Sequence, residues 1–319
     1  MAVFHEQIGQ TPPAHDSERA NGSLEDLKSA CAGREELAEL AGLLESSPPI
    51  LALLTSIFGN SPYLTSLAIR DPEGLQDWLV SDPEDCFARL DEALRQTMAS
   101  ADKQETAMRA LRLYKKRAAL WLALADVGAV WDVMRVTHVL SEVAGTAITE
   151  AVHYLFARAA QSGKFTPSDP AAPEASMGYF VLGLGKLGAF ELNYSSDVDL
   201  IIFYDPERAT LGDSVEPAQF FVRMTRDLVS LLQERTADGY VFRTDLRLRP
   251  DPGATQVALS TDAGLSYYES FGLNWERAAL IKARTIAGDI EAGEDFLEQL
   301  SPFIWRKYLD YAAIADIHT

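Results

Sequence analysis

The sequence is poor in cysteine, with only Cys31 and Cys86 among 319 residues. Two cysteines cannot form a disulfide framework, and their spacing matches no zinc-binding motif. We therefore interpret both as thiols of a reducing compartment, and we expect a cytoplasmic protein.

A signal peptide and long hydrophobic runs are also missing. The first residues, MAVFHEQIGQ, lack a basic segment followed by an apolar one. The longest apolar stretches, such as residues 49–58, are too short to span a bilayer. No membrane contact is expected.

Basic residues are too few to balance the acidic ones. The sequence has 28 Lys and Arg against 47 Asp and Glu, which gives a formal net charge of -19. So acidic a surface repels a phosphate backbone, and no nucleic-acid partner is expected. A small nucleotide is still compatible with this charge, because a bound cation can reverse the field locally.

The pattern of residues divides the chain into five parts. Residues 1–23 are rich in Pro, Ser, Gly and His and are predicted to form a disordered tail. Residues 24–161 have helical periodicity, and residues 162–177 form a linker rich in Pro, Ser and Ala. A sheet-containing catalytic domain is predicted over 178–261, and a further helical region over 262–319. The predicted fold class is α+β and mostly helical, and the sequence ends so soon after a helix-like stretch that we expect a fragment of a longer protein.

Within these parts, two long helices are predicted over residues 105–127 and 130–160, and a third, amphipathic helix over 217–234. Short strands rich in β-branched and aromatic residues are predicted in the sheet domain. They cover residues 179–182, 198–204, 240–249 and 256–260.

Two aspartates mark the start of the second strand. Asp197 and Asp199 are two positions apart, so both side chains leave the same face of the strand, while Val198 and Leu200 point into the core. Two carboxylates held in this way repel each other unless a cation lies between them. Hard oxygen ligands favour Mg²⁺, which shares its other positions with water and substrate phosphates.

The third strand presents one carboxylate among three arginines. Strand alternation places four polar side chains on one face, namely Arg243, Asp245, Arg247 and Arg249. A solvated surface face would have the same pattern. A phosphate-handling cleft is the alternative, in which Asp245 completes a two-metal site or acts as general base and an arginine neutralises charge on phosphorus.

A glycine turn precedes the aspartates. Gly183, Gly185 and Gly188 fit the dinucleotide fingerprint G-x-G-x-x-G, but residues 193–196 interrupt the helix that this fingerprint requires. A phosphate loop requires Gly-Lys followed by Ser or Thr. Lys186 is followed by leucine, so this motif is excluded. A turn whose backbone N–H groups hold phosphate oxygens beside metal ions fits better.

These residues resemble the DNA polymerase β-type nucleotidyltransferase superfamily, in which a glycine turn precedes Asp-x-Asp on the next strand. The usual Gly-Ser of that turn is Gly185-Lys186 here. The longer block GLGKLGAFELNYSSDVDLI (183–201) resembles the bifunctional glutamine synthetase adenylyltransferase/adenylyl-removing family. Two further blocks agree in order and spacing, FRTDLRLRP (242–250) and YYESFGLNWERAALIKAR (267–284), and the likeness runs from about Pro48 to the end.

The resemblance implies a polymerase β-like catalytic domain in which Asp197, Asp199 and Asp245 are both the catalytic residues and the ligands of Mg²⁺, for which Mn²⁺ can substitute. It implies ADP or ATP and inorganic phosphate as the other small molecules. Candidate nucleotide- or phosphate-binding residues are Gly185, Lys186, Ser195, Ser196, Arg247, Arg249 and Lys282. For the two arginines and Lys282, a surface salt bridge is an open alternative. Trp275 and Tyr268 either line the nucleotide pocket or are buried between helices.

Full-length members of this family carry two catalytic halves. One removes AMP from a tyrosine of glutamine synthetase by phosphorolysis, and the other attaches AMP from ATP. The start at Met1, the motif Ser195-Ser196-Asp197 and the block Trp275-Glu276-Arg277 favour the removing half. The partners implied are glutamine synthetase and a PII-type signalling protein. The attaching activity and a non-catalytic nucleotide-sensing module are the alternatives.

Overall fold

A computed structural model describes residues 3–305 of the chain, which divides into two compact units. Of the described residues, 3–94 and 113–139 form unit 1, and 95–112 and 140–305 form unit 2. Three long helices carry residues of both units, namely α6 (Pro83–Ala99), α7 (Gln104–Val127) and α8 (Val133–Gln161). The last two confirm the long helices expected from periodicity.

Unit 1 is helical. Its shorter elements are η1 (Phe4–Glu6), α1 (Ser17–Cys31), η2 (Glu35–Leu37), α2 (Ala38–Ser46), α3 (Pro48–Asn60), α4 (Pro62–Arg70) and α5 (Pro72–Val80). Helices α3 to α6 each begin at a proline, where the missing N–H leaves no helical hydrogen bond unmade. Within residues 3–305 no single helix is long and apolar enough to cross a membrane, and one sharply bent pair of segments, Glu35–Ser46 with Pro48–Asn60, meets the criteria of length and composition.

The N-terminal segment differs from the disordered tail predicted for residues 1–23. The Phe4 side chain is fully buried and lies 5.1 Å from the Trp78 ring, and the Phe4 N–H donates to the carbonyl of Ser81. Helix α1 begins at Ser17, because the Asp16 carboxylate accepts the N–H of Arg19 and caps the first turn. The prediction of disorder was based on the high content of polar residues and did not consider the single buried aromatic side chain of Phe4.

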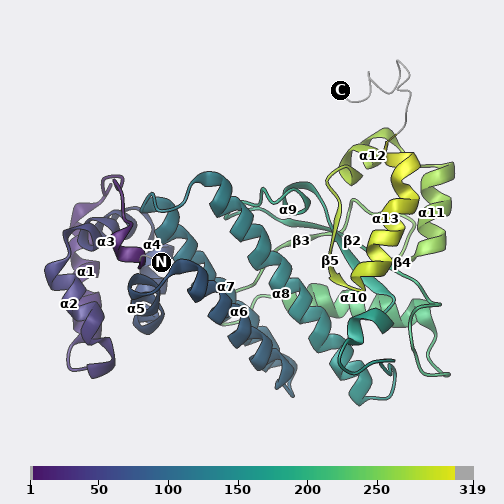
Figure 1. The fold of residues 1–319 in the computed structure, drawn as a ribbon, viewed down its shortest axis with the longest axis horizontal. Helices are drawn as coiled ribbons and strands as arrows, with labels where there is room; N and C mark the ends of the chain where they lie inside the picture. Colours follow the sequence, from purple (N-terminus) through teal and green to yellow (C-terminus); the bar gives the residue numbers. More distant parts are fainter. Residues whose placement is uncertain (1–2, 306–319) are drawn as a thin grey trace. The chain divides into compact units, whose positions relative to one another are not determined.

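Unit 2 contains a five-stranded mixed sheet (Figure 1). The strands are β1 (Tyr179–Gly183), β2 (Val198–Tyr204), β3 (Thr244–Asp245), β4 (Leu259–Ser260) and β5 (Arg284–Gly288). Their order is β3-β2-β1-β5, with β4 also paired to β2. Strand β1 is antiparallel to β2 and β5, whereas β3 and β4 run parallel to β2.

Helices cover both faces of this sheet. On one face, the Tyr179 ring stacks on Phe221 of α10 (Pro217–Gln233) and contacts Phe156 of α8. On the other face, Phe203 lies 4.4 Å from Phe296 of α13 (Ile290–Ile304), in a core that includes Tyr268 of α11 (Thr261–Ser270). The remaining elements are η3 (Pro173–Ser176), α9 (Gly185–Gly188) and α12 (Asn274–Leu280).

Three predictions about the sheet domain need correction. The strand expected over 240–249 is reduced to β3, because the chain turns over residues 246–249 and the Arg249 guanidinium binds the carbonyls of the following loop. The strand expected over 256–260 is reduced to β4. Strand β5 lies in the region predicted as helical and pairs with β1, so the sheet extends beyond residue 261. Residues 306–319 of that region lie outside the described residues.

Candidate active site

The glycine turn between β1 and β2 is packed directly against Asp199. Gly185 has a φ of +54°, which few residues other than glycine adopt, and a Cβ there would lie 2.8 Å from Asp199 Oδ2. The N–H of Leu184 donates to the Asp199 carbonyl at 3.0 Å. Turn and strand are therefore held as one piece.

Asp199 and Asp245 are register partners in the adjacent parallel strands β2 and β3. Register partners project to the same side of a sheet, with strands about 4.8 Å apart, so the two carboxylates are neighbours. Burial raises the pKa of Asp199, and the charges of Asp245 and Asp197 raise it further, while Arg247 and Lys186 oppose the shift. A cation between these groups would relieve their repulsion.

Two arginines bind the other carboxylates of the site. The Arg243 guanidinium pairs with Asp197 and also donates to the Ser195 carbonyl at 2.7 Å. Arg247 pairs with both oxygens of Asp245, at 2.9 and 3.0 Å from its Nε, and this hydrogen bonding lowers the pKa of Asp245. The side chains of Arg243 and Arg247 are 51% and 83% exposed.

These ion pairs decide how the carboxylates are oriented. Over residues 3–305, no three Asp, Glu, His or Cys side chains are gathered as a metal-binding group. Asp197 and Asp245 face guanidinium groups, although the backbone places all three aspartates at one corner of the sheet. The carboxylate oxygens are the hard donors that Mg²⁺ prefers, so the residues fit the ion by type and backbone position. Metal binding by these residues stays a prediction.

Other predicted site residues lie on the turn and on the loop before β2. Lys186 is exposed, and its charge reaches Asp199. The Ser196 hydroxyl donates to Asn193 at 2.9 Å, so it stabilises its own loop, and Ser195 is exposed beside it. Of the two serines, Ser195 is the one whose backbone carbonyl accepts a hydrogen bond from Arg243.

Arg249 is bound by the loop that follows β3. Its guanidinium donates to the carbonyls of Leu246 and Pro252, both at 2.8 Å, and of Gln256 at 3.1 Å. The expected strand is a loop at this point, and phosphate binding by Arg249 stays a prediction that these bonds do not favour. Lys282 pairs with Glu191 at 2.8 Å, which is the surface salt bridge considered as its alternative role.

The two aromatic residues considered for the nucleotide pocket have different positions. Tyr268 is buried in the core below β2 and is only 1% exposed. Trp275 is 46% exposed on α12. Burial between helices is therefore confirmed for Tyr268 but not for Trp275.

Two arginines near the turn were not among the predicted site residues. Arg243 was noticed only as one of an alternating set. Arg284 begins β5, with its guanidinium 3.8 Å from the Phe190 ring centroid and a hydrogen bond to the Leu187 carbonyl at 3.3 Å. Its position follows from the pairing of β5 with β1, a contact about a hundred residues apart that local periodicity does not reveal.

Known proteins are similar to this chain. A family model described as "Glutamate-ammonia ligase adenylyltransferase" matches residues 51–299. Proteins named "Bifunctional glutamine synthetase adenylyltransferase/adenylyl-removing enzyme" are similar to the chain. One from Bradyrhizobium diazoefficiens is 52% identical over 266 residues, covering 83% of this chain and 27% of that protein. One from Rhodopseudomonas palustris is 46% identical over 316 residues, covering 98% of this chain and 31% of that protein. One from Xanthobacter autotrophicus is 47% identical over 309 residues, covering 97% of this chain and 31% of that protein. The chain thus spans less than a third of the length of these relatives.

Proposed function

The chain belongs to the glutamate–ammonia ligase adenylyltransferase family, and we propose that it is a Mg²⁺-dependent nucleotidyltransferase that acts at the corner formed by α9, β2 and β3. The observation that carries this proposal is the register pairing of Asp199 with Asp245 beside Gly185. Neighbouring carboxylates next to a glycine turn that is packed against one of them suit the binding of a cation together with phosphate.

The proposed reaction is the phosphorolytic removal of AMP from an adenylylated tyrosine of glutamine synthetase. An oxygen of inorganic phosphate forms a bond to the α-phosphorus, and the bond from that phosphorus to the tyrosine oxygen breaks. ADP leaves, and the phenolate takes up a proton. The motif Ser195-Ser196-Asp197 and the block Trp275-Glu276-Arg277 support this direction by their resemblance to the removing half of the family. A PII-type protein is proposed as a regulatory partner.

The exposed arginines have a second role in this proposal. Exposed ion pairs are worth only about 0–1 kcal/mol, so the half-exposed Arg243–Asp197 pair is easily exchanged. In the other pair Arg247 is exposed but Asp245 is only 17% exposed, so a cation would have to replace the contact of Arg247 with both carboxylate oxygens. Bound Mg²⁺ would neutralise charge on the attacking and leaving oxygens. Arg243 and Arg247, no longer required by the carboxylates, would then hold phosphate oxygens through paired N–H donors.

The experiment supplies the protein with adenylylated glutamine synthetase, phosphate and Mg²⁺, and measures ADP. In a second arm it receives unmodified glutamine synthetase and ATP. ADP in the first arm supports removal, whereas pyrophosphate and AMP attachment in the second would reverse the proposed direction. Nucleotide binding without turnover in either arm would indicate a non-catalytic module.

The matched variants are Asp197→Asn and Asp213→Asn. Removal of a group that orients a metal ligand typically reduces activity by roughly 10–100-fold. Loss of the ligand itself, in Asp197→Asn, should reduce turnover at least as much. Asp213 lies on an exposed loop, and its replacement should leave turnover unchanged. Equal activity of Asp197→Asn and the control would contradict the assignment of the site.

A further inference from the structure

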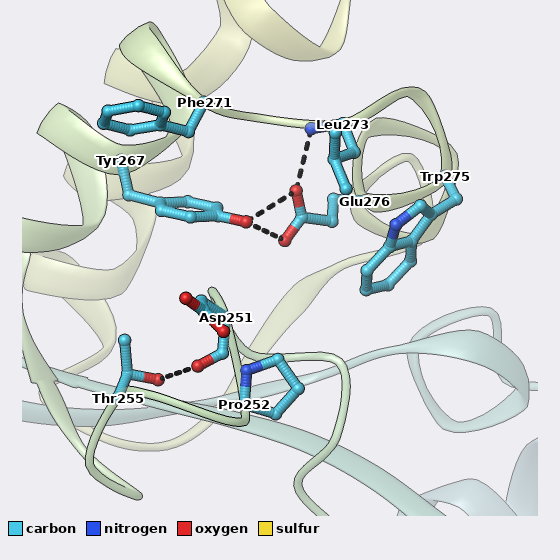
Figure 2. Close-up of a pocket in the computed structure, with 8 residues that line it drawn as sticks. All are labelled: Asp251, Pro252, Thr255, Tyr267, Phe271, Leu273, Trp275 and Glu276. Carbon is cyan, nitrogen blue, oxygen red and sulfur yellow. Dashed lines mark hydrogen bonds between the residues drawn. The ribbon is translucent and has the colours of Figure 1, made fainter.

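A pocket of about 560 Å³ opens between α11, α12 and the loop that follows β3 (Figure 2). Its lining residues are Asp251, Pro252, Thr255, Tyr267, Phe271, Leu273, Trp275 and Glu276. None of the residues proposed for catalysis is among them. The size is typical of ligand pockets.

The floor of this pocket is a buried carboxylate. Glu276 is 1% exposed, and its oxygens accept the Leu273 N–H at 2.8 Å and the Tyr267 hydroxyl at 3.1 Å. Both donors are neutral. The burial of this carboxyl raises its pKa, and the charge of Asp251 acts in the same direction.

Negative charge dominates the side chains that line the pocket, although the Arg249 guanidinium donates to the backbone carbonyls of Pro252 and Thr255 in the same loop. Two of the eight lining residues are acidic and none is basic. Asp251 is the only charged group among those that shift the pKa of Glu276. Such a pocket repels phosphate, which distinguishes it from the proposed active site, and it attracts a cation.

Aromatic surfaces surround this negative charge. Phe271 is 71% exposed and Trp275 46% exposed, and the rings of Tyr267 and Trp275 lie on either side of the Glu276 carboxylate (Figure 2). Exposed aromatic faces beside a carboxylate favour a planar cation, because a guanidinium group can stack on a ring and bind a carboxylate with two N–H donors at once.

The wall that carries Asp251 is preformed. Asp251 has a φ of +39°, an unusual conformation for a residue other than glycine. Its carbonyl accepts the Thr255 hydroxyl at 2.9 Å, and Arg249 donates to the Pro252 carbonyl beneath the loop. A strained residue held in this way on a pocket wall is typical of a binding site.

We propose that this pocket binds the guanidinium group of an arginine side chain presented by a protein partner, between the carboxylates of Asp251 and Glu276 and the rings of Tyr267 and Trp275. An ammonium group would gain the charge attraction but not the planar stacking. The inference goes beyond the proposed function and is independent of the direction in which AMP moves.

The test is a calorimetric titration of the whole chain with N-acetyl-arginine-methylamide, the corresponding citrulline compound, the corresponding lysine compound and free arginine. Citrulline has the same shape but no charge. We expect saturable binding of the blocked arginine, at least 10-fold weaker binding of the lysine compound and no binding of citrulline. Equal binding of citrulline would overturn the proposal, and tighter binding of free arginine would assign the pocket to a small molecule instead of a protein.

Variants locate the binding. Asp251→Asn removes the charge and keeps a residue that tolerates positive φ, and Trp275→Leu removes the ring from an exposed position. Each should weaken binding at least 10-fold, with an unchanged circular dichroism spectrum. Asp262→Asn, on the exposed start of α11 and outside the pocket, is the control. Unchanged binding in both pocket variants, or equal weakening in the control, would refute the site.

Discussion

Replacing Gly185 by alanine separates the structural role of the glycine turn from its role at the site. The backbone of Gly185 has a φ of +54°, and an L-residue in that conformation costs about 1–2 kcal/mol. The new Cβ would also lie 2.8 Å from Asp199 Oδ2. The backbone cannot move away freely, because Leu184 is hydrogen-bonded to the Asp199 carbonyl. The end of the Asp199 side chain therefore moves.

Two measurements follow from this geometry. Urea unfolding followed by circular dichroism should give a free energy of unfolding lower by about 1–2 kcal/mol, the backbone cost alone. Calorimetric titration with Mn²⁺ should give an affinity about 10–100-fold weaker, the usual effect of disturbing groups that orient a metal ligand. Turnover with Mg²⁺ should fall in parallel.

Gly163→Ala is the matched control. Gly163 has a φ of +69° and no atom within 4 Å of the position of a Cβ, so alanine there has the backbone cost without a contact. We expect the same loss of stability and unchanged Mn²⁺ affinity. If Gly185→Ala loses stability like the control but binds Mn²⁺ like the wild type, the turn does not position Asp199 and the reasoning is refuted.

Two further predictions concern arginine and histidine side chains. Arg249→Gln should lower the free energy of unfolding by about 1.5–3 kcal/mol, because a charged donor to the carbonyls of a loop is lost. Arg247→Gln should change the free energy of unfolding by less than about 0.5 kcal/mol, but it should reduce turnover. The opposite order in urea unfolding would contradict both assignments. Burial lowers the pKa of His153, but Glu150 and Glu174 outweigh it and raise this pKa above 6.5. The stabilisation is thus complete below pH 6.5 and is lost as the pH rises above 6.5 through the raised pKa. His153→Gln should abolish this decline in urea unfolding, and an unchanged slope in the variant would exclude His153 as its source.

The elements that the sequence predicted best are those with a strong local pattern. Helices α7 and α8 follow from periodicity over more than twenty residues each, and β2 follows from a run of β-branched and aromatic residues that begins between the aspartates. Strand β5 has only five residues, and its conformation depends on hydrogen bonds to β1. A window of neighbouring residues contains no information about such a partner, so the segment was assigned to a helix.

The alternating residues 243–249 show where prediction of the site reaches its limit. Alternation placed Arg243, Arg247 and Arg249 on one face, yet each of them binds a different partner. Arg243 pairs with Asp197, Arg247 pairs with Asp245, and Arg249 donates to loop carbonyls. A short aspartate side chain lies where its backbone places it, so the register of β2 and β3 is enough to bring Asp199 and Asp245 together. An arginine reaches several ångströms in many directions, and its partner is chosen by the tertiary structure around it. The neighbouring positions of these carboxylates could therefore be predicted from the sequence, whereas the partners of the arginines could be found only in the structure.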